Sequence, residues 1–337
     1  MRTMKFDEAV EDALAFAMER DERIVFYGED VRMIHHDLYV RFGGRRVRDT
    51  PISEAAFVGA AVTAGMAGLR PIVEVMMVDF LGVAIDGLLN QASKVEAFSG
   101  GMWKVPMVVR TPCGGGLGDG GQHQQALWGW LAHIPGLTVV VPSNPADAGG
   151  FMLAALAHEG PVVFMEPKLL AANWRDFFGA CGRETVKFDV PESGAKGPVP
   201  DVWKSLPFGR AAVLREGADL TMASVGVGVH RALEAAAVLA ERGISAEVVD
   251  LRTVSPLDRE LLLSCVSRTG RMLVVDEDYE SCGLSGELAA LALEAGLSFT
   301  FARVCTPGVI PYSREEEARV LPNTQRIVDA ARKLLAD

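Results

Sequence analysis

Three short segments combine chemically useful side chains with the turns that end strands. In the first, Thr50-Pro51-Ile52-Ser53-Glu54, a carboxylate stands where an extended stretch meets a helix of small residues. Burying a glutamate among apolar neighbours is costly unless it is hydrogen bonded. Glu54 is therefore one of two things. It is either a ligand-binding group at the carboxyl end of a strand or an acid that accepts hydrogen bonds from the free backbone amides in the first turn of a helix.

The second segment places an aromatic side chain at a similar junction. Phe80 follows the apolar stretch 71–77 and opens a long helical pattern over 79–98. An aromatic ring in this place can form one wall of a pocket for a flat ligand ring. The alternative is a core phenylalanine packed between sheet and helix.

The third segment is rich in glycine, with six glycines among residues 114–121. Such a loop is entropically costly, so it must either approach another part of the structure closely or move. His123 closes the loop at the expected start of a helix, where the helix dipole would disfavour a protonated ring and keep it ready for acid–base chemistry. The alternative is a solvent-exposed histidine at a helix start.

Composition limits the partners of the chain. Of its 337 residues, 49% are hydrophobic and 23% charged, which is enough apolar material for a large core. The chain has 33 lysines and arginines and 44 acidic residues, which gives a net charge of −11. It therefore lacks the excess of basic residues that binding to nucleic acids or anionic membranes requires. The N-terminal stretch has no apolar secretory segment, which predicts a cytoplasmic protein.

Cysteine and histidine usage argues against a metal site or a disulfide framework. The five cysteines form no C-x-x-C pair, and an odd number in a chain of this size is typical of reduced thiols. Of the six histidines, only His35 and His36 are close in sequence, and adjacent side chains point apart on a helix or a strand. We predict no metal ligands among them.

Apolar runs of strand length alternate with helical patterns along almost the whole chain, which predicts an α/β fold with two parallel sheets. Strands are expected at 24–27, 71–77, 106–110, 137–141, 161–165, 219–225, 244–251, 271–276 and 298–304. Helices are expected at 6–20, 54–67, 79–98, 125–132, 145–158, 229–241, 257–269, 284–295 and 324–335.

The alternation of strand and helix patterns stops between Gly179 and Pro207, where Gly, Pro, Lys and Glu predominate. This composition is typical of an exposed linker. We therefore predict a first domain at 1–180, a linker at 181–207 and a second domain at 208–337.

In this order and spacing, the segments resemble the beta subunit of the thiamine diphosphate-dependent component of 2-oxo acid dehydrogenase complexes, in the pyruvate, branched-chain and acetoin group of the transketolase-like superfamily. The resemblance extends over nearly the whole chain. Its segments are 27–31, 50–61, 90–94, 99–101, 110–112, 132–137, 250–258, 274–277 and 321–323.

The resemblance implies a pyrimidine-binding domain of thiamine diphosphate enzymes followed by a transketolase C-terminal-like domain. It implies oxidative decarboxylation of a 2-oxo acid with acyl transfer to lipoamide. Glu54 would be the carboxylic partner of the cofactor's aminopyrimidine ring, on which Phe80 would stack, and Ile52 and Met76 would line the same pocket. His123 matches the family's active-site histidine, expected to orient or protonate intermediates and to assist acyl transfer.

In the resembled family, the diphosphate and Mg²⁺ lie on a separate alpha subunit. This chain would then hold half of an active site in an α2β2 heterotetramer, and a lipoyl acyltransferase core would be a further partner. Gly118-Asp119-Gly120 with Asn144 is similar to a magnesium diphosphate motif, but a glycine loop separates Asp119 from the strand end that such a motif needs. We expect no metal ligand in this chain.

The chain departs from the family at the residue after the histidine, where Gln124 replaces the usual serine. This glutamine and the glycine-rich loop leave open the small subunit of a split transketolase or a related thiamine diphosphate-dependent carboligase. A non-catalytic scaffold subunit is a third alternative, against which the presence of Glu54, Phe80 and His123 counts.

A second departure concerns potassium. The family's K⁺ site uses backbone near positions that match Met107, Ala155 and Leu156, together with an Asp and an Asn. Here the polar positions are His158 and Gly160. K⁺ is therefore in doubt as a cofactor.

Overall fold

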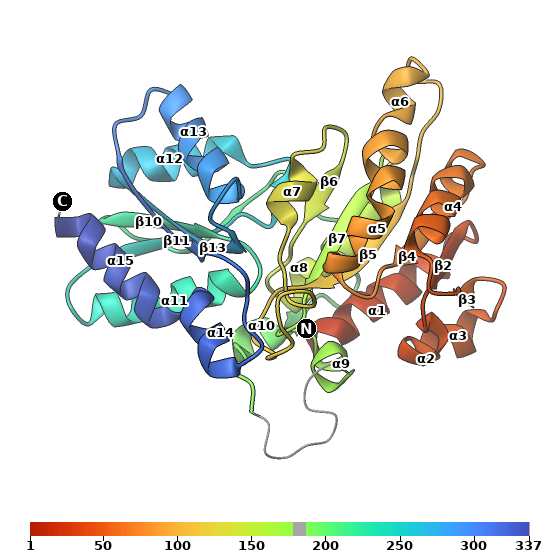
Figure 1. Cartoon of the computed structure of the whole chain (residues 1–337), viewed down its shortest axis with the longest axis horizontal. Helices are drawn as coiled ribbons and strands as arrows, with labels where there is room; N and C mark the ends of the chain where they lie inside the picture. Colours follow the sequence, from red (N-terminus) through yellow and green to blue (C-terminus); the bar gives the residue numbers. More distant parts are fainter. Residues whose placement is uncertain (178–186, 337) are drawn as a thin grey trace.

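The computed structural model describes residues 1–177 and 187–336. They form two α/β halves, each built on its own sheet, that lie side by side along the long axis of the molecule (Figure 1). The α/β fold with two mainly parallel sheets is therefore confirmed. Within these ranges, no helix has both the length and the apolar character needed to cross a membrane.

The first half is built on a seven-stranded sheet in which all neighbours are parallel except β12 and β6. The central strands are buried along their whole length, which a parallel sheet covered by helices on both faces requires. In sheet order, the strands are β12 (Thr253–Ser255), β6 (Thr138–Val140), β7 (Val162–Pro167), β5 (Val108–Cys113), β4 (Arg70–Glu74), β2 (Ile24–Gly28) and β3 (Val47–Asp49).

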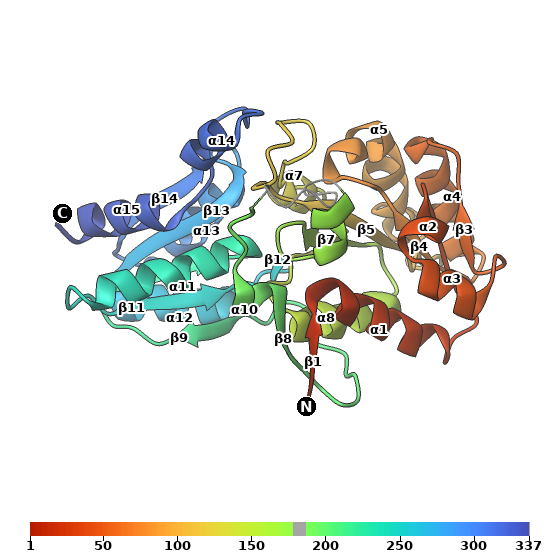
Figure 2. The same ribbon diagram turned by 90° about the horizontal axis from the view of Figure 1, so that it is seen from below.

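Different helices cover the two faces of this sheet (Figure 2). On one face, α1 (Phe6–Met18) and α8 (Pro145–Ala157) share an apolar core with the strands. On the other face, α4 (Glu54–Met66) and α5 (Leu81–Asp86) do the same. The start of α8 follows from its sequence, because Asn144 Oδ1 accepts from the Asp147 amide at 3.0 Å and a proline fills the first turn.

The single helix expected over 79–98 is interrupted. It consists of a 3-10 turn η1 (Val78–Phe80), α5, a π-helical turn η2 (Gly87–Ala92) and α6 (Val95–Phe98). At Gly87 an added Cβ would lie 3.2 Å from Val58 Cγ1, so α4 and η2 approach closely there. The apolar spacing predicted a helical segment, but it carried no signal for the wide turn.

The second half has a five-stranded sheet in which β9 is antiparallel to its neighbour. In sheet order, the strands are β14 (Thr300–Thr306), β13 (Arg271–Tyr279), β10 (Leu220–Ser224), β11 (Ala246–Asp250) and β9 (Ala212–Arg215). One face carries α11 (Val227–Ala240) and α15 (Thr324–Ala336), and the other carries α12 (Arg259–Thr269) and α13 (Leu284–Glu294). Short helices complete the chain: α2 (Val31–Ile34), α3 (His36–Phe42), α7 (Trp128–Ala132), α9 (Ala172–Arg175), α10 (Glu192–Ala195) and α14 (Arg314–Val320).

The two halves are joined through a common core. β12 follows β11 in the chain yet pairs with β6 at the edge of the first sheet. The apolar cluster under α4 and α5 continues without a break into the residues under α12 and α13. The second half is therefore packed directly against the first.

Part of the segment expected to be an exposed linker is built into the fold. β8 (Lys196–Val199) pairs antiparallel with β1 (Arg2–Lys5). Trp203 is buried, and its Nε1 donates to Asp12 Oδ2 at 2.7 Å. The polar composition hid this pairing because the partner strand lies at the start of the chain. Residues 181–186 of the predicted linker, and the preceding 178–180, lie outside the described residues.

A buried ionic network supports the middle strands. His35 is fully buried, with Nδ1 against Glu11 Oε1 and Nε2 2.8 Å from Glu74 Oε2. Arg110 is also fully buried, with Nη1 3.5 Å from Glu74 Oε2 and an ion pair to Glu166. Glu74 ends β4, so these contacts fix the strand that leads into the second sequence-predicted segment.

Candidate active site

The three chemically distinctive segments meet at one edge of the seven-stranded sheet. β3, β2, β4 and β5 are parallel neighbours, and Asp49, Gly28, Glu74 and Arg110 lie in register near their carboxyl ends. Glu54 follows β3, Phe80 follows β4 and His123 follows β5. Ligands of open α/β sheets bind at this edge, so the topology places all three residues in one functional region.

Glu54 opens α4 with a carboxyl group that is available to an external partner. It is 9% exposed, and within residues 1–177 and 187–336 it makes no hydrogen bond or ion pair. The amides at the helix start favour a negative charge there. The pKa of neighbouring Glu29 is raised by partial burial and by the charges of Asp30 and Glu54. The carboxyl groups of Glu29 and Glu54 therefore interact electrostatically at this position.

Met76 and Phe80 flank the carboxyl end of β4. Phe80 is half-buried against the α4 and α5 core, whereas Met76 is half-buried against the α1 and α8 core. Ile52 lies in the turn before α4 and is 73% exposed. Its exposed side chain would therefore need cover from another molecule to form the predicted pocket wall.

His123 meets Phe80 edge to face, with ring centroids 5.9 Å apart and planes at 80°. Its Nδ1 lies 3.2 Å from the carbonyl oxygen of Asp119. Because a carbonyl can only accept, Nδ1 carries the proton and Nε2 is the basic nitrogen. Two of the three sequence-predicted side chains, Phe80 and His123, are thus in direct contact.

His123 does not stand at a helix start, which corrects the sequence-based expectation. α7 begins at Trp128, after Leu127 in a left-handed conformation with φ 52°. His123 lies in the turn 121–124 instead. Because the effect of a helix dipole fades within the first turn, the dipole of α7 does not act on this imidazole. The hydrogen bond to Asp119 orients the ring.

The glycines of the loop between β5 and α7 are required by close approach to the second half of the chain. An added Cβ would lie 2.5 Å from Leu321 Cδ1 at Gly115, 2.7 Å from Arg314 Cγ at Gly118 and 2.7 Å from the Tyr312 ring at Gly120. The loop reaches across to α14 (Figure 2). Of the two interpretations offered by the sequence, close packing therefore accounts for the glycine content.

Hydrogen bonds close the loop at its base and along its length. The Gly114 amide donates to the Gln125 carbonyl at 2.9 Å. The Leu117 amide donates to Gln124 Oε1 at 2.9 Å, and Gln124 is buried. Gln124 thus helps to hold the loop together.

Sequence reasoning missed several polar groups around these segments. Asp79 Oδ1 accepts from Gln125 Nε2 at 2.8 Å, and the Tyr279 hydroxyl donates to Gln125 Oε1 at 2.9 Å. Lys168, in the turn after β7, donates to the His123 carbonyl. Burial lowers the pKa of the Lys168 ammonium group. The position of Asp79 next to Phe80 was a usable signal. Tyr279 and Lys168 come from distant parts of the chain, so no local pattern pointed to them.

The motif that looks like a magnesium diphosphate site is explained by other contacts. Asn144 caps α8, and Asp119 lies in the glycine-rich loop, away from the end of β5. Across the described residues, no group of three or more His, Cys, Asp or Glu side chains is placed to hold a metal ion.

The end of α8 does not fit a potassium ion. The carbonyl oxygens of Leu156 and His158 both accept from Arg70 Nη1, each at 2.9 Å. The Met107 carbonyl accepts from the Val162 amide at 2.9 Å. The Arg70 guanidinium therefore already supplies positive charge to the carbonyl groups that a cation would need.

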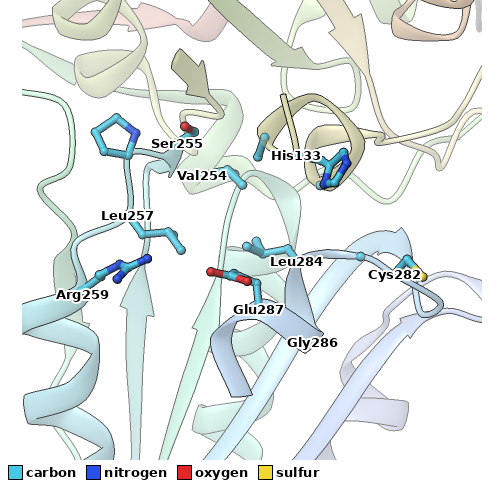
Figure 3. Close-up of a pocket in the computed structure, with 13 residues that line it drawn as sticks. His133, Val254, Ser255, Leu257, Arg259, Cys282, Leu284, Gly286 and Glu287 are labelled. Carbon is cyan, nitrogen blue, oxygen red and sulfur yellow. The ribbon is translucent and has the colours of Figure 1, made fainter. Parts of the chain in front are cut away.

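A cavity of about 560 Å³ lies at the junction of the halves, between α7, the segment after β12 and the start of α13 (Figure 3). His133, Arg259, Cys282 and Glu287 are among its lining residues, but Glu54, Phe80 and His123 are not. This cavity is thus separate from the three predicted side chains. This separation is expected if their pocket is completed by another chain.

Comparison with known proteins identifies the family. Residues 2–173 match the family described as "Transketolase, pyrimidine binding domain" and residues 209–327 match "Transketolase, C-terminal domain". A solved structure of a split gene transketolase, an inactive beta4 tetramer, matches this chain with a TM-score of 0.77 over 99% of this chain and 98% of its own. Its sequence identity is 24%, so the match supports the fold alone.

Relatives in sequence extend over the whole chain. The beta subunit of acetoin:2,6-dichlorophenolindophenol oxidoreductase of Bacillus subtilis (strain 168) is 37% identical over 100% of this chain and 98% of its own. The 2-oxoisovalerate dehydrogenase subunit beta of the same organism is 36% identical, over 99% of this chain and 99% of its own length. The pyruvate dehydrogenase E1 component subunit beta of Rhizobium meliloti (strain 1021) is also 36% identical, over 98% of this chain and 70% of its own length. These matches confirm the resemblance read from the sequence. The chain belongs to the transketolase-like family that includes the beta subunits of pyruvate, 2-oxoisovalerate and acetoin-oxidising enzymes.

Proposed function

We propose that this chain is the beta subunit of a thiamine diphosphate-dependent 2-oxo acid dehydrogenase, which oxidatively decarboxylates a 2-oxo acid and passes the acyl group to lipoamide. The observation that carries the proposal is Glu54, whose carboxyl group is nearly buried yet makes no bond within the described chain. A carboxyl group without a partner in its own chain is available to bind a ligand that donates to it. The named activities of the relatives support the same reading.

The residues at the sheet edge fit the aminopyrimidine end of the cofactor. Glu54 would bind a nitrogen of the aminopyrimidine ring and could hold or release a proton there. Phe80 offers a ring face for stacking, with Met76 beside it. When bound, thiamine diphosphate supplies the carbon nucleophile and the electron sink for loss of carbon dioxide.

His123 supplies the acid–base group on the substrate side. The Asp119 carbonyl fixes the proton on Nδ1, so Nε2 takes a proton from, or returns one to, the reacting oxygen or the attacking thiol. The edge-to-face contact with Phe80 keeps the imidazole beside the position proposed for the pyrimidine. Histidine and glutamate thus act on different atoms of one assembled site.

The site is completed by an alpha subunit in an α2β2 heterotetramer. Ile52 is 73% exposed although it stands two residues from Glu54, as expected for a wall that a partner covers. The partner holds the diphosphate and Mg²⁺, and a lipoyl acyltransferase core receives the acyl group. No potassium ion is needed at the end of α8, where Arg70 bonds the carbonyl oxygens.

The carboligase alternative loses its specific support. Gln124 is buried and its Oε1 accepts from the Leu117 amide, which gives this glutamine a role in stabilising the loop. The glycines meet residues of the second half of the chain, which gives them a packing role in either enzyme class.

The test is co-purification of the chain with the alpha subunit of the same organism. The complex should reduce ferricyanide with pyruvate or a branched-chain 2-oxo acid when thiamine diphosphate and Mg²⁺ are present, whereas the chain alone should not. Acetoin serves as a third substrate and a ketose phosphate as the carboligase substrate. Activity of the lone chain would overturn the half-site proposal, and turnover confined to the ketose phosphate would establish the carboligase.

A further inference from the structure

Glu317 in α14 connects the second half of the chain to the loop that carries His123. The side chain is 2% exposed, and both of its oxygens bind backbone amides of the loop. Oε1 accepts from the Gly116 amide at 2.9 Å, and Oε2 accepts from the Gly118 amide at 3.0 Å. Hydrogen bonds from amides to a carboxylate are stronger than bonds between neutral groups. Two such bonds therefore hold one limb of the loop.

The conformation of that limb explains why a carboxylate is needed. Gly116 and Gly118 have φ values of 98° and 76°, in the left-handed region. The two amides point to the same acceptor group, which a bidentate carboxylate can satisfy with both oxygens. A glutamine would offer one acceptor oxygen and place an NH₂ group against the other amide.

A short chain of contacts runs from Glu317 to the imidazole. Gly118, held by Oε2, is followed directly by Asp119. The Asp119 carbonyl accepts from His123 Nδ1 at 3.2 Å and so sets both the orientation of the ring and the position of its proton. Three links therefore separate a buried glutamate of the second half from the basic nitrogen of His123.

We propose that Glu317 is a positioning residue for His123. By fixing Gly116 and Gly118 it holds the Asp119 carbonyl in place and keeps His123 Nε2 directed at the substrate. The second half of the chain thereby takes part in organising the active site, beyond assembly and contact with partners. The catalytic role of His123 in this proposal rests on the proposed function. The attachment of the loop by Glu317 is independent of that function.

Three variants separate this role from general stability. Glu317→Gln retains the size of the side chain and one acceptor oxygen, and Glu317→Ala removes both. Glu315→Gln is the matched control, because Glu315 lies on the same helix with an exposed side chain. Hydrogen exchange of peptides from 114–123 is measured in the full chain, alone and with the alpha subunit. Peptides from α11 and α15 report global stability.

We expect exchange within 114–123 to rise roughly tenfold or more in Glu317→Ala and by less in Glu317→Gln, with α11 and α15 unchanged. In the α2β2 complex, kcat for acyl transfer should fall about tenfold in Glu317→Ala while KM for the 2-oxo acid stays within about twofold, because Glu54 and Phe80 are untouched. The limb of the pH–rate profile that belongs to His123 should also move.

Loop exchange equal to that of Glu315→Gln would overturn the proposal, as would a uniform rise of exchange throughout the chain. A loosened loop with unchanged kcat and pH profile would also overturn it. If the complex has no activity with any 2-oxo acid, the proposed function fails, while the exchange data still decide whether Glu317 pins the loop. If Glu317→Ala does not fold, Glu317→Gln carries the same comparison.

Discussion

The carboxyl group of Glu54 should be essential for turnover and dispensable for folding. It is nearly buried without a bonding partner in the described chain, so Glu54→Gln removes proton exchange but no internal contact. We expect kcat of the α2β2 complex to fall by a factor of roughly 100 or more, as is usual for loss of a general acid–base group. Assembly and the thermal midpoint should not change. Glu22→Gln on the exposed surface is the control, and a near-normal rate in Glu54→Gln would contradict the assignment.

His35 should give the protein a stability that disappears at alkaline pH. Burial lowers the pKa of its imidazole, but the charge of Glu74 and hydrogen bonds to Glu11 and Glu74 outweigh burial and raise it to about 9 from 6.5. The folded state thus binds this proton more tightly than the unfolded state does. The contribution is fully present below pH 6.5 and is lost as pH rises towards 9.

The measurement is the free energy of unfolding from pH 6 to 9.5. The wild type should lose on the order of 3 kcal/mol through this group. In His35→Gln this decrease of the free energy of unfolding with pH should be absent. His36→Gln, at the exposed neighbouring position, should retain it. Equal slopes in wild type and His35→Gln would show that the network does not hold a proton.

Residue types and spacing were sufficient to propose Glu54, Phe80 and His123. Phe80 and His123 follow strands whose apolar pattern is visible in the sequence, whereas β3, the short strand before Glu54, is not among the expected strands. Residue types and spacing were not sufficient for Glu317 and His35. The partners of these residues lie on distant elements, and neither residue stands in a distinctive local pattern. A buried ionic contact becomes recognisable only after the fold brings its members together.

At the scale of elements, the glycine-rich loop is a packed structure, which Gly120 tests. Its φ is 77°, and an added Cβ would lie 2.7 Å from the Tyr312 ring. Gly120→Ala should therefore cost about 1–3 kcal/mol of the free energy of unfolding through strain and overlap. Gly82→Ala in α5 is the control, because no atom lies within 4 Å of the added Cβ and the helix gains propensity. Comparable midpoints in the two variants, measured by calorimetry, would indicate a mobile loop.

Arg70, at the start of β4, should make the end of α8 independent of potassium. Its Nη1 bonds the carbonyl oxygens of Leu156 and His158, and its side chain is 13% exposed. The thermal midpoint of the wild type should be the same in potassium and sodium chloride at equal ionic strength. Arg70→Met should lose about 1–3 kcal/mol, since the carbonyl groups lose their donor. A wild-type midpoint that rises specifically with potassium would refute this account.

The regular elements were predictable where one apolar period persisted. The predicted strands of both sheets and the helices α1, α4, α8, α11 and α15 are all present, with ends that differ by a few residues. The failures have local causes. Close packing at Gly87 accompanies a π-helical turn, α7 begins only at Trp128, and the strand pair β1 and β8 joins remote segments of polar composition.

At the scale of the whole molecule, the sequence predicted two α/β units but not how they share a core. β12 crosses to the first sheet, and the apolar cluster under α4 continues to α13. Such coupling cannot be read from hydrophobic periodicity, because periodicity indicates which face of an element is buried and not what buries it. The high apolar content of the chain serves this junction as well as the two separate cores.

The junction also contains a carboxyl group that should make the assembled molecule less stable above neutral pH. Glu277 in β13 is 7% exposed, and in the described part of the chain its Oε2 has no hydrogen-bond partner. Burial raises its pKa to about 7 from 4.5, with Arg231 and Lys168 opposing and Glu317 adding to the rise. The folded state therefore prefers the protonated acid, and stability is lost as pH rises from 4.5 to about 7.

Glu277→Gln removes this ionisation while keeping the shape of the side chain, so it should stabilise the protein at pH 8 by up to roughly 3 kcal/mol and have little effect at pH 5. The measurement is denaturant unfolding at both pH values. Glu294→Gln at the exposed end of α13 is the control and should show no difference between the two. A glutamine variant that is less stable than the wild type at pH 8 would mean that the Glu277 carboxylate binds a partner there.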